Sequence, residues 1–251
     1  MKIALLADIH GNAIALEAVL ADIERQGGAD AYWVLGDLVA IGPDPVGVLE
    51  RLSALKDLRV IRGNTDRYVA VNDRPGPSIA EVQADASLLK PLIQVANTFA
   101  WTQGMVTAAG WLPWLKELPL DFEMELPEGT RFHGVHASPG TDDGTGISPA
   151  SSEEEIGTLF NGCGAGLVCV GHTHLPLDRR WGQMHLVNPG SVGLSRTPDL
   201  HACYAFLDAE SEGYRVTHRR AAFDRQKVID QLIDLAHPAR EYIIYHLTHP
   251  V

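Results

Sequence analysis

The sequence predicts an α+β fold in which two β-sheets face each other, and three observations support this. Short apolar runs alternate with helical patterns up to about residue 64, which is typical of parallel βαβ units. Clustered strands with little helix between them follow from about residue 121, and they indicate a second, largely antiparallel sheet. The sequence shows no internal repeat, low-complexity tract or linker. We therefore expect a single domain over residues 1–251, with a helical insertion at about 78–118.

The first part of the chain reads as three strands separated by two helices. Apolar runs with strand-like composition and apolar residues at helical spacing distinguish the two kinds of element. The expected order is strand 2–8, helix 13–26, strand 31–37, helix 46–56 and strand 58–64. Parallel sheets of this kind bind ligands beyond the carboxyl ends of their strands.

The remaining elements follow from the same patterns. The insertion carries aromatic residues at loosely helical spacing: Phe99, Trp101, Trp111 and Trp114. The favoured interpretation is a helical pair whose aromatic stripe packs on the core, and the alternative is an apolar wall over a substrate pocket. Expected strands follow at 121–126, 130–138, 167–174, 184–191, 202–208 and 214–221, with helices at 152–160 and 224–236 and then a short tail.

The composition argues against an extended nucleic-acid-binding surface and is compatible with small phosphorylated substrates. A formal net charge of −12 is unlike the clustered Lys and Arg of an extended nucleic-acid surface. No apolar run approaches the roughly 20 residues of a membrane-spanning helix, and the apolar run before Asp8 lacks the pattern of a signal peptide. The three cysteines form no CxxC pair, which suits a cytoplasmic location. The sequence does not determine the oligomeric state.

Polar residues with metal-binding side chains follow the apolar strands one after another. They are Asp8 and His10 after the first strand, Asp37 after the second, Asn64 after the third, His136 after a later one, and His172 and His174 in a Gly-His-Thr-His segment. Side chains two residues apart in an extended segment point the same way. We therefore expect Asp8 with His10, and His172 with His174, to form ligand pairs.

This set of donors suits borderline divalent cations such as Mn, Fe, Zn, Ni or Co. A carboxylate such as Asp37 can bridge two ions about 3.5–4 Å apart, the separation typical of two-metal phosphatases and nucleases. Two such ions bring a charge of about +4 against about −2 from Asp8 and Asp37. An acidic protein can thus attract a small phosphorylated substrate.

Each of these residues also has a structural interpretation. Asp8 or Asn12 can cap the helix that follows, Asn64 can be a turn residue, and a single His136 can be a core histidine. Their joint occurrence at successive strand ends favours the metal site.

The ordered motifs resemble the calcineurin-like metallophosphoesterase superfamily. The series is D-x-H at 8–10, Gly-Asp at 36–37, Gly-Asn at 63–64, His136 and Gly-His-Thr-His at 171–174. The segments GDLVAIGPDP, RGNTD, GHTHLP and NPGSVG are similar to its YfcE-like small phosphodiesterase branch. The resemblance implies a four-layer α/β/β/α sandwich of two mixed sheets with a dinuclear site. It assigns Asp8, His10, Asp37 and His174 to one ion, and Asp37, Asn64, His136 and His172 to the other.

The chain departs from the family pattern at Thr65. Relatives with a GNHD or GNHE motif carry a histidine there that assists the leaving group. Threonine cannot act as a general acid near neutral pH, so a good leaving group such as an aryloxide is favoured. Some members of the small phosphodiesterase branch also lack this histidine. His136 is followed by Ala137 and Ser138 where the family usually has Gly-Ser.

The resulting hypothesis is a phosphodiesterase in which metal-bound hydroxide attacks a small phosphodiester, with manganese as the favoured metal. Asp37, Asn64 and His136 are the expected catalytic residues. Arg67 and Arg196 are candidates for phosphate contact or ordinary surface arginines, and Asp66 for orienting a ligand or capping a turn.

Two alternatives remain open. One is a phosphomonoesterase or a diadenosine-polyphosphate hydrolase on the same fold. The other is a non-catalytic scaffold like the related subunit of the retromer complex, for which exposed apolar residues around Trp111 and Trp114 would be the feature to find.

Overall fold

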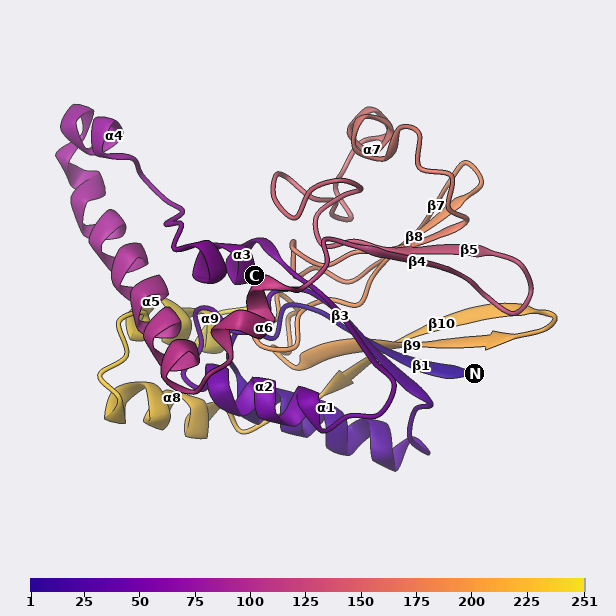
Figure 1. The fold of residues 1–251 in the computed structure, drawn as a ribbon, viewed down its shortest axis with the longest axis horizontal. Coiled ribbons are helices and arrows are strands. Elements are labelled where there is room, and N and C mark those ends of the chain that lie inside the picture. Colours follow the sequence, from indigo (N-terminus) through magenta and orange to yellow (C-terminus); the bar gives the residue numbers. More distant parts are fainter. Residues whose placement is uncertain (251) are drawn as a thin grey trace.

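A computed structural model of the protein describes residues 1–250, and in it two five-stranded sheets face each other (Figure 1). The first sheet has the order β10-β9-β1-β2-β3, with β1 at Lys2–Leu6, β2 at Ala31–Leu35, β3 at Leu58–Ile61, β9 at Ala202–Glu210 and β10 at Gly213–Ala221. The second has the order β4-β5-β6-β8-β7, with β4 at Phe122–Glu125, β5 at Arg131–Gly134, β6 at Leu167–Cys169, β7 at Leu177–Trp181 and β8 at Met184–Asn188.

Helices cover the outer face of each sheet. In Figure 1, α1 and α2 lie on the far side of the first sheet and α7 on the far side of the second. This arrangement confirms the expected four layers. The helices are α1 (Ala13–Arg25), α2 (Pro45–Ser53), α3 (Asn64–Val71), α4 (Ile79–Ala84), the 3₁₀ turn η1 (Ala86–Leu88), α5 (Leu89–Ala108), α6 (Leu112–Lys116), α7 (Glu153–Phe160), α8 (Arg225–Asp234) and α9 (Arg240–Thr248).

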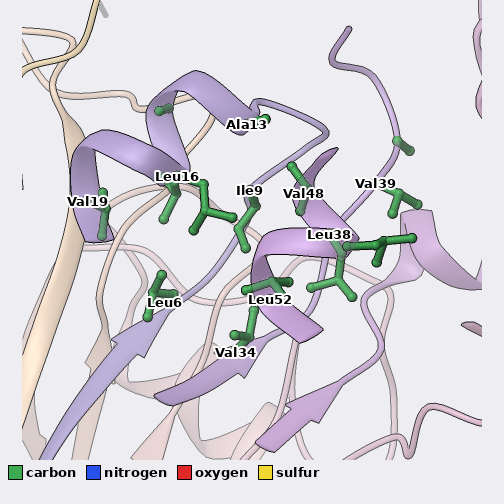
Figure 2. Packing of buried hydrophobic residues seen from close by; sticks show 14 of the residues in the cluster. Leu6, Ile9, Ala13, Leu16, Val19, Val34, Leu38, Val39, Val48 and Leu52 are labelled. Atoms are coloured by element: carbon green, nitrogen blue, oxygen red, sulfur yellow. The ribbon is translucent and has the colours of Figure 1, made fainter. Parts of the chain in front are cut away.

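The alternation of side chains along the strands builds the layers. In β1, Ala4 and Leu6 face the helices while Ile3 and Leu5 face the second sheet. Figure 2 shows Leu6 packing with residues of α1 and α2. Both faces of the strand are thus apolar, as expected for strands buried in a parallel sheet.

Both sheets are mixed, so the prediction of a largely antiparallel second sheet is wrong. Strand β6 pairs in parallel with both β5 and β8, and only the edge strands β4 and β7 are antiparallel. The expected strands at 202–208 and 214–221 extend the first sheet instead, where β9 runs antiparallel to β1. Strand β9 is buried over most of its length, which a place in either sheet could provide, so its pairing with β1 decides where it lies.

Three elements lie outside the sequence-based assignment. Strand β7 falls between two expected strands, α3 begins at Asn64 where a strand was expected to end, and the expected tail forms helix α9. The start of α3 depends on Asp66, whose carboxylate accepts a hydrogen bond from the backbone N–H of Gly63 (2.9 Å). Such a local capping contact ends a strand without any change in apolar pattern.

The helices at residues 79–116 occupy the expected insertion and project beyond the sheets at the end of α5 that joins α4 (Figure 1). Phe99 is buried, and Trp111 and Trp114 are partly buried against the α1–α2 side of the core, where their rings meet edge to face at 5.8 Å. The aromatic stripe therefore packs on the core as expected. Between residues 1 and 250, no helix combines the length and apolar character needed to cross a membrane.

Candidate metal centre

All seven expected metal ligands lie on loops or helix starts that follow strands. Asp8 and His10 follow β1, Asp37 follows β2, Asn64 opens α3 after β3, His136 follows β5, and His172 and His174 follow β6. The strands belong to both sheets, so the candidate site is assembled where the ends of the two sheets meet.

The first group of side chains is compact. One ligand atom each from Asp8, His10, Asp37 and His174 lies within 4.8 Å of all the others. Nε2 of His10 and Nε2 of His174 are 2.9 Å apart, and Nε2 of His174 is 3.6 Å from Oδ1 of Asp8. These donors converge on a volume the size of one cation.

The second group is organised around the amide of Asn64. Its Oδ1 lies 3.2 Å from Nε2 of His136 and 3.2 Å from Nδ1 of His172. Asp37 belongs to both groups, because its Oδ2 is 3.6 Å from Nε2 of His10 and 3.5 Å from Nε2 of His136. A carboxylate in this place is suited to bridge two ions.

Each of the four histidine rings is oriented by a backbone carbonyl on the side away from the centre. The pairs are His10 Nδ1 with Ala40 O (3.2 Å), His136 Nδ1 with Leu35 O (2.6 Å), His172 Nε2 with Gly144 O (2.8 Å) and His174 Nδ1 with Leu194 O (3.0 Å). A carbonyl accepts only from N–H, so this outer nitrogen carries a proton, and in a neutral ring the inner nitrogen presents a lone pair. Metal-binding histidines are typically held in this way.

The donor set fits divalent cations. With their outer nitrogens protonated, His10 and His174 direct two lone pairs at each other across 2.9 Å, an unfavourable contact that a shared cation relieves. Oδ2 of Asp8 is buried and has no hydrogen-bond partner within residues 1–250. A buried carboxylate oxygen without a partner is costly, and a cation would satisfy it.

Burial sets the protonation of the site. Burial lowers the pKa of His10, His172 and His174, so these rings are neutral, the form that binds metals. Burial raises the pKa of Asp8 to about 8. Burial alone would raise the pKa of Asp37 as well, but the charge of His136 holds it well below its usual range. In the metal-free chain, Asp37 and His136 therefore form an ion pair.

The backbone at the site is in the left-handed region. The φ angles are 54° at Asp8, 50° at His10, 56° at Asp37, 69° at His172 and 62° at His174. Non-glycine residues avoid this region, and it concentrates at functional sites. The expectation that these ligands lie in extended segments is therefore wrong. Asp8 and His10 still belong to one group as expected, but His172 and His174 do not pair: His174 turns toward His10, whereas His172 turns toward Asn64.

Two glycines allow the loops to approach this closely. Gly36 has a φ of +86°, and a Cβ there would lie 2.6 Å from Nδ1 of His136. A Cβ on Gly63 would lie 2.0 Å from Oδ1 of Asp37. The Gly-Asp and Gly-Asn motifs thus have a steric explanation, because a side chain at either glycine would displace a candidate ligand.

Asn188 and Ser191 support the candidate site. The sequence did not predict them individually, although the NPGSVG segment that contains them resembles a family motif. Asn188 donates from its side chain to the carbonyl of Gly171 (2.7 Å), and the hydroxyl of Ser191 donates to the carbonyl of Asp8 (2.7 Å). Both side chains are buried. They hold in place the two loops that carry candidate ligands. In the sequence, the feature that could have predicted this role is the pair of polar residues at and just after the end of an apolar strand.

Asp66 acts on the loops rather than on the centre directly. It is fully buried and accepts hydrogen bonds from the backbone N–H groups of Leu38 and Gly63, both at 2.9 Å. Burial, helped by the charge of Asp37, raises the pKa of its carboxyl to about 7. Asp66 therefore ties the loop of Asp37 to the loop of Asn64.

Thr65 is buried next to the centre. Its backbone N–H donates to Oδ1 of Asp37 (3.0 Å), and its hydroxyl has no hydrogen-bond partner within the described residues. Thr65 thus orients the Asp37 carboxylate through its backbone.

The two candidate arginines differ in their surroundings. The Arg67 guanidinium pairs with Asp142 (2.9 Å), Asp143 (3.0 Å) and Asp73 (3.6 Å). Arg196 is exposed, and within residues 1–250 it makes no ion pair or side-chain hydrogen bond. Its charge acts on His174 of the centre. Of the two, Arg196 is the cation available to an incoming anion.

Two facing mixed sheets, with Asp, Asn and His side chains gathered at the strand ends, define the architecture of a metallophosphoesterase. A family model described as the calcineurin-like phosphoesterase superfamily domain matches residues 1–212. The chain belongs to this superfamily, whose members hydrolyse phosphoric esters with divalent metals.

Three individual proteins that are similar to this chain are consistent with its membership of the superfamily. An uncharacterized protein of Methanocaldococcus jannaschii is 27% identical over 246 residues, which cover 92% of this chain and 91% of that protein. A crystal structure of a metallophosphoesterase from Sphaerobacter thermophilus is 26% identical with a TM-score of 0.78, covering 100% and 99% of the two chains. A symmetrical bis(5′-nucleosyl)-tetraphosphatase of Shigella dysenteriae is 30% identical over 139 residues, about half of each chain (49% of both).

Proposed function

We propose that this protein is a phosphodiesterase that hydrolyses a small phosphodiester at a site for two divalent metal ions. The single observation that carries the proposal is the position of Asp37, whose Oδ2 lies 3.6 Å from His10 and 3.5 Å from His136. Asp37 belongs to both sets of donors, as a bridging carboxylate does.

The ligands would divide between the two ions. Asp8, His10, Asp37 and His174 would hold one ion, and Asp37, Asn64, His136 and His172 the other. Mixed carboxylate, imidazole and amide donors suit Mn, Fe, Zn, Ni or Co, and we favour Mn. When bound, these ions supply positive charge to the phosphate and lower the pKa of water toward neutrality.

The side chains of this chain would then position the substrate. Asn64 can donate from its amide N–H₂ to a phosphate oxygen while its Oδ1 faces the two histidines. Arg196 contributes a cation without a competing carboxylate. Arg67 is already paired with three carboxylates, so we assign the phosphate contact to Arg196. The role that we assign to Arg67 is to hold the loop that contains Asp142.

Position 65 beside the candidate centre carries a threonine and not a histidine. Thr65 cannot protonate an alkoxide near neutral pH, so we expect a preference for esters whose leaving group is already stable as an anion. This favours aryl and phosphoanhydride leaving groups over simple alkoxides. We also propose that residues 1–251 form a single domain with an inserted helical segment.

The test compares two substrates on Mn²⁺-loaded protein. A bis-aryl phosphate should be hydrolysed faster than the corresponding mono-aryl phosphate. Asp37→Asn and His136→Ala should each lower kcat/KM by at least about 100-fold, because each removes a group that holds a metal ion. Full activity of both variants would refute the assigned site, and absence of turnover with Mn, Co, Ni and Zn would refute the function.

A matched control is Asp178→Asn. Asp178 pairs with His185 at 2.8 Å on the second sheet, away from the centre, and its loss should leave kcat/KM within about 2-fold. A dinucleoside tetraphosphate belongs in the same assay, because the partial match to the Shigella enzyme makes it the second candidate substrate. Faster hydrolysis of that substrate than of the bis-aryl phosphate would favour the second candidate.

A further inference from the structure

A cavity of about 480 Å³ adjoins the candidate centre and shares Asn64 with it. Its volume lies within the range of small-molecule pockets, about 300–1,000 Å³. None of its lining residues is charged.

The walls come from parts of the chain that surround the sandwich. Helix α5 of the insertion contributes five of the lining residues, from Pro91 to Phe99, and the C-terminal region contributes Ala239 and Tyr242. Of the two walls, the C-terminal one lies beyond residue 212, outside the residues that the family model matches, whereas α5 lies within them.

The lining is suited to a flat ring. Tyr68 and Phe99 meet edge to face at 5.8 Å, and Tyr242 lies on the C-terminal side. Aromatic side chains favour the face or edge of another ring. Gln94 adds an amide that makes no side-chain hydrogen bond within residues 1–250, so it is available to a polar ring edge.

The loop of the shared carboxylate also contributes to the lining. Ile41 follows Asp37 by four residues and has a φ of +85°, a region that a β-branched residue adopts rarely. Its side chain packs against two core clusters and lines the cavity. The fold thus keeps an unfavourable backbone conformation at the point where the metal loop meets the cavity, as functional sites often do.

The junction between cavity and centre carries the groups that a phosphate needs. Asn64 and Tyr68 both line the cavity. Because the Tyr68 hydroxyl donates to the Asp143 carboxylate, the Asn64 amide N–H₂ is the group there that can donate to a phosphate. Arg196 acts electrostatically on His174 of the centre and on Tyr242 of the cavity. An ester held between them would place its phosphate at the charged end and its substituent at the apolar end.

We propose that this cavity binds a neutral planar ring carried as a substituent of the phosphoester, either a nucleobase or a simple aryl group. The inference rests on the proposed function, because the phosphate is taken to lie at the candidate metal centre. It assigns ring specificity to α5 and α9, outside the metal loops. Charged substituents such as amino acids or further phosphates have no partner in the cavity.

The test measures binding of ligands that cannot be hydrolysed. Mn²⁺-loaded protein is titrated calorimetrically with methylphosphonate, phenylphosphonate and a 5′-phosphonate analogue of adenosine. We expect the two ring compounds to bind at least about 10-fold more tightly than methylphosphonate, because each buries a ring that the methyl compound lacks. Tighter binding of the adenosine analogue identifies a nucleobase site, and tighter binding of phenylphosphonate a simple aryl site.

Variants locate the site. Val95→Trp fills the cavity and should remove the preference for rings. Tyr242→Ala changes a side chain that is 45% exposed, so it tests the same wall with little risk to folding, and it should reduce the preference. Met105→Ala lies on α5 outside the cavity and should leave the ratio of affinities unchanged.

The outcomes separate the two proposals. Equal affinity for phenylphosphonate and methylphosphonate, or a preference that survives both Val95→Trp and Tyr242→Ala, would overturn the ring site. If bis-aryl phosphate is nevertheless hydrolysed, the proposed function stands without it. If ring preference is found in a protein that hydrolyses no phosphoester, the cavity assignment stands and the proposed function fails.

Discussion

Ala236 occupies a backbone position that glycine adopts more readily. It follows the end of α8 with a φ of 45°. The hydrogen bonds from Ala236 N–H to Ile233 O (2.9 Å) and from His237 N–H to Leu232 O (3.0 Å) form a Schellman motif, whose left-handed residue is usually glycine. We predict that Ala236→Gly raises the free energy of unfolding by about 0.5–1 kcal/mol, measured by urea denaturation.

The matched control is Ala109→Gly at the end of α5. Ala109 is also exposed but has a φ of −84°, where glycine gains nothing and loses more entropy on folding. That change should lower the free energy of unfolding by about 0.5–1 kcal/mol. A loss of stability in both variants would contradict the explanation from the φ angle.

His237 makes stability depend on pH. Its ring is 1% exposed and packs edge to face on Trp101, with Nε2 unpartnered within residues 1–250. Burial lowers the pKa of His237 to about 4 from an ordinary 6.5. The unfolded chain therefore binds a proton between pH 6.5 and 4 that the folded chain does not, so stability falls as pH falls through this window. At pH 5 the loss is about 2 kcal/mol relative to pH 8.

The variant His237→Asn isolates this contribution. Nδ1 of His237 accepts from the backbone N–H of Ala239 (3.1 Å), and the Asn side-chain oxygen can replace that acceptor without titrating. The variant loses the contact with Trp101 and should be less stable at pH 8. Its further loss between pH 8 and pH 5 should be about 2 kcal/mol smaller than in the wild type. An identical pH profile would show that the ring titrates normally.

The identities of the candidate ligands could be predicted from the sequence, but their orientation could not. Asp8 and His10 follow an apolar strand, and that pattern is local. Their left-handed backbone depends on contacts with a distant segment, from Asp8 N–H to Gly36 O (3.0 Å) and from His10 N–H to Asp37 O (2.9 Å). Pattern and spacing carry no information on such pairing, so the extended geometry that we expected was wrong.

At the scale of elements, a charged cluster joins α3 to the loop between β5 and α7. The side chain of Asp142 is 5% exposed and pairs with Arg62 (2.7 Å) and Arg67 (2.9 Å). The next residues of this loop include Gly144, whose carbonyl orients His172. The cluster therefore holds one side of the candidate centre.

We predict that Asp142→Asn lowers the free energy of unfolding by about 1–3 kcal/mol, because two arginines lose their most buried partner while solvent still reaches them in part. Urea denaturation measures this. Glu153→Gln is the control, since Glu153 pairs with Arg179 while 72% exposed and should change stability by less than about 0.5 kcal/mol. Equal effects of the two substitutions would mean that the cluster is not a stabilising contact.

The prediction of elements was limited by the same long-range effects. Helices with a continuous apolar stripe, such as α1 and α8, were found from the sequence. The place of β9 in the first sheet was not, because its apolar run fits either sheet and only the pairing with β1 decides. Helix α9 was missed because its mixed composition, with Tyr and His among the apolar residues, gives little periodic signal.

At the scale of the molecule, the chain is acidic, and the candidate centre is a place within residues 1–250 that could hold cations. The net charge is −12, while the candidate centre gathers four imidazoles around two buried carboxylates. Without metal, the unpartnered oxygen of Asp8 and the facing rings of His10 and His174 oppose folding. Metal binding and folding are therefore coupled.

We predict that metal raises thermal stability. At a free Mn²⁺ concentration 100 times the Kd, binding adds about 2.7 kcal/mol, which corresponds to a rise in Tm of about 5–10 °C for a chain of this size. Calorimetry of EDTA-treated protein before and after addition of Mn²⁺ measures it. Asp37→Asn should lose most of this rise because the shared carboxylate is gone, whereas Asp178→Asn should keep it. An equal rise in Tm in both variants would place the stabilising ion elsewhere in the molecule.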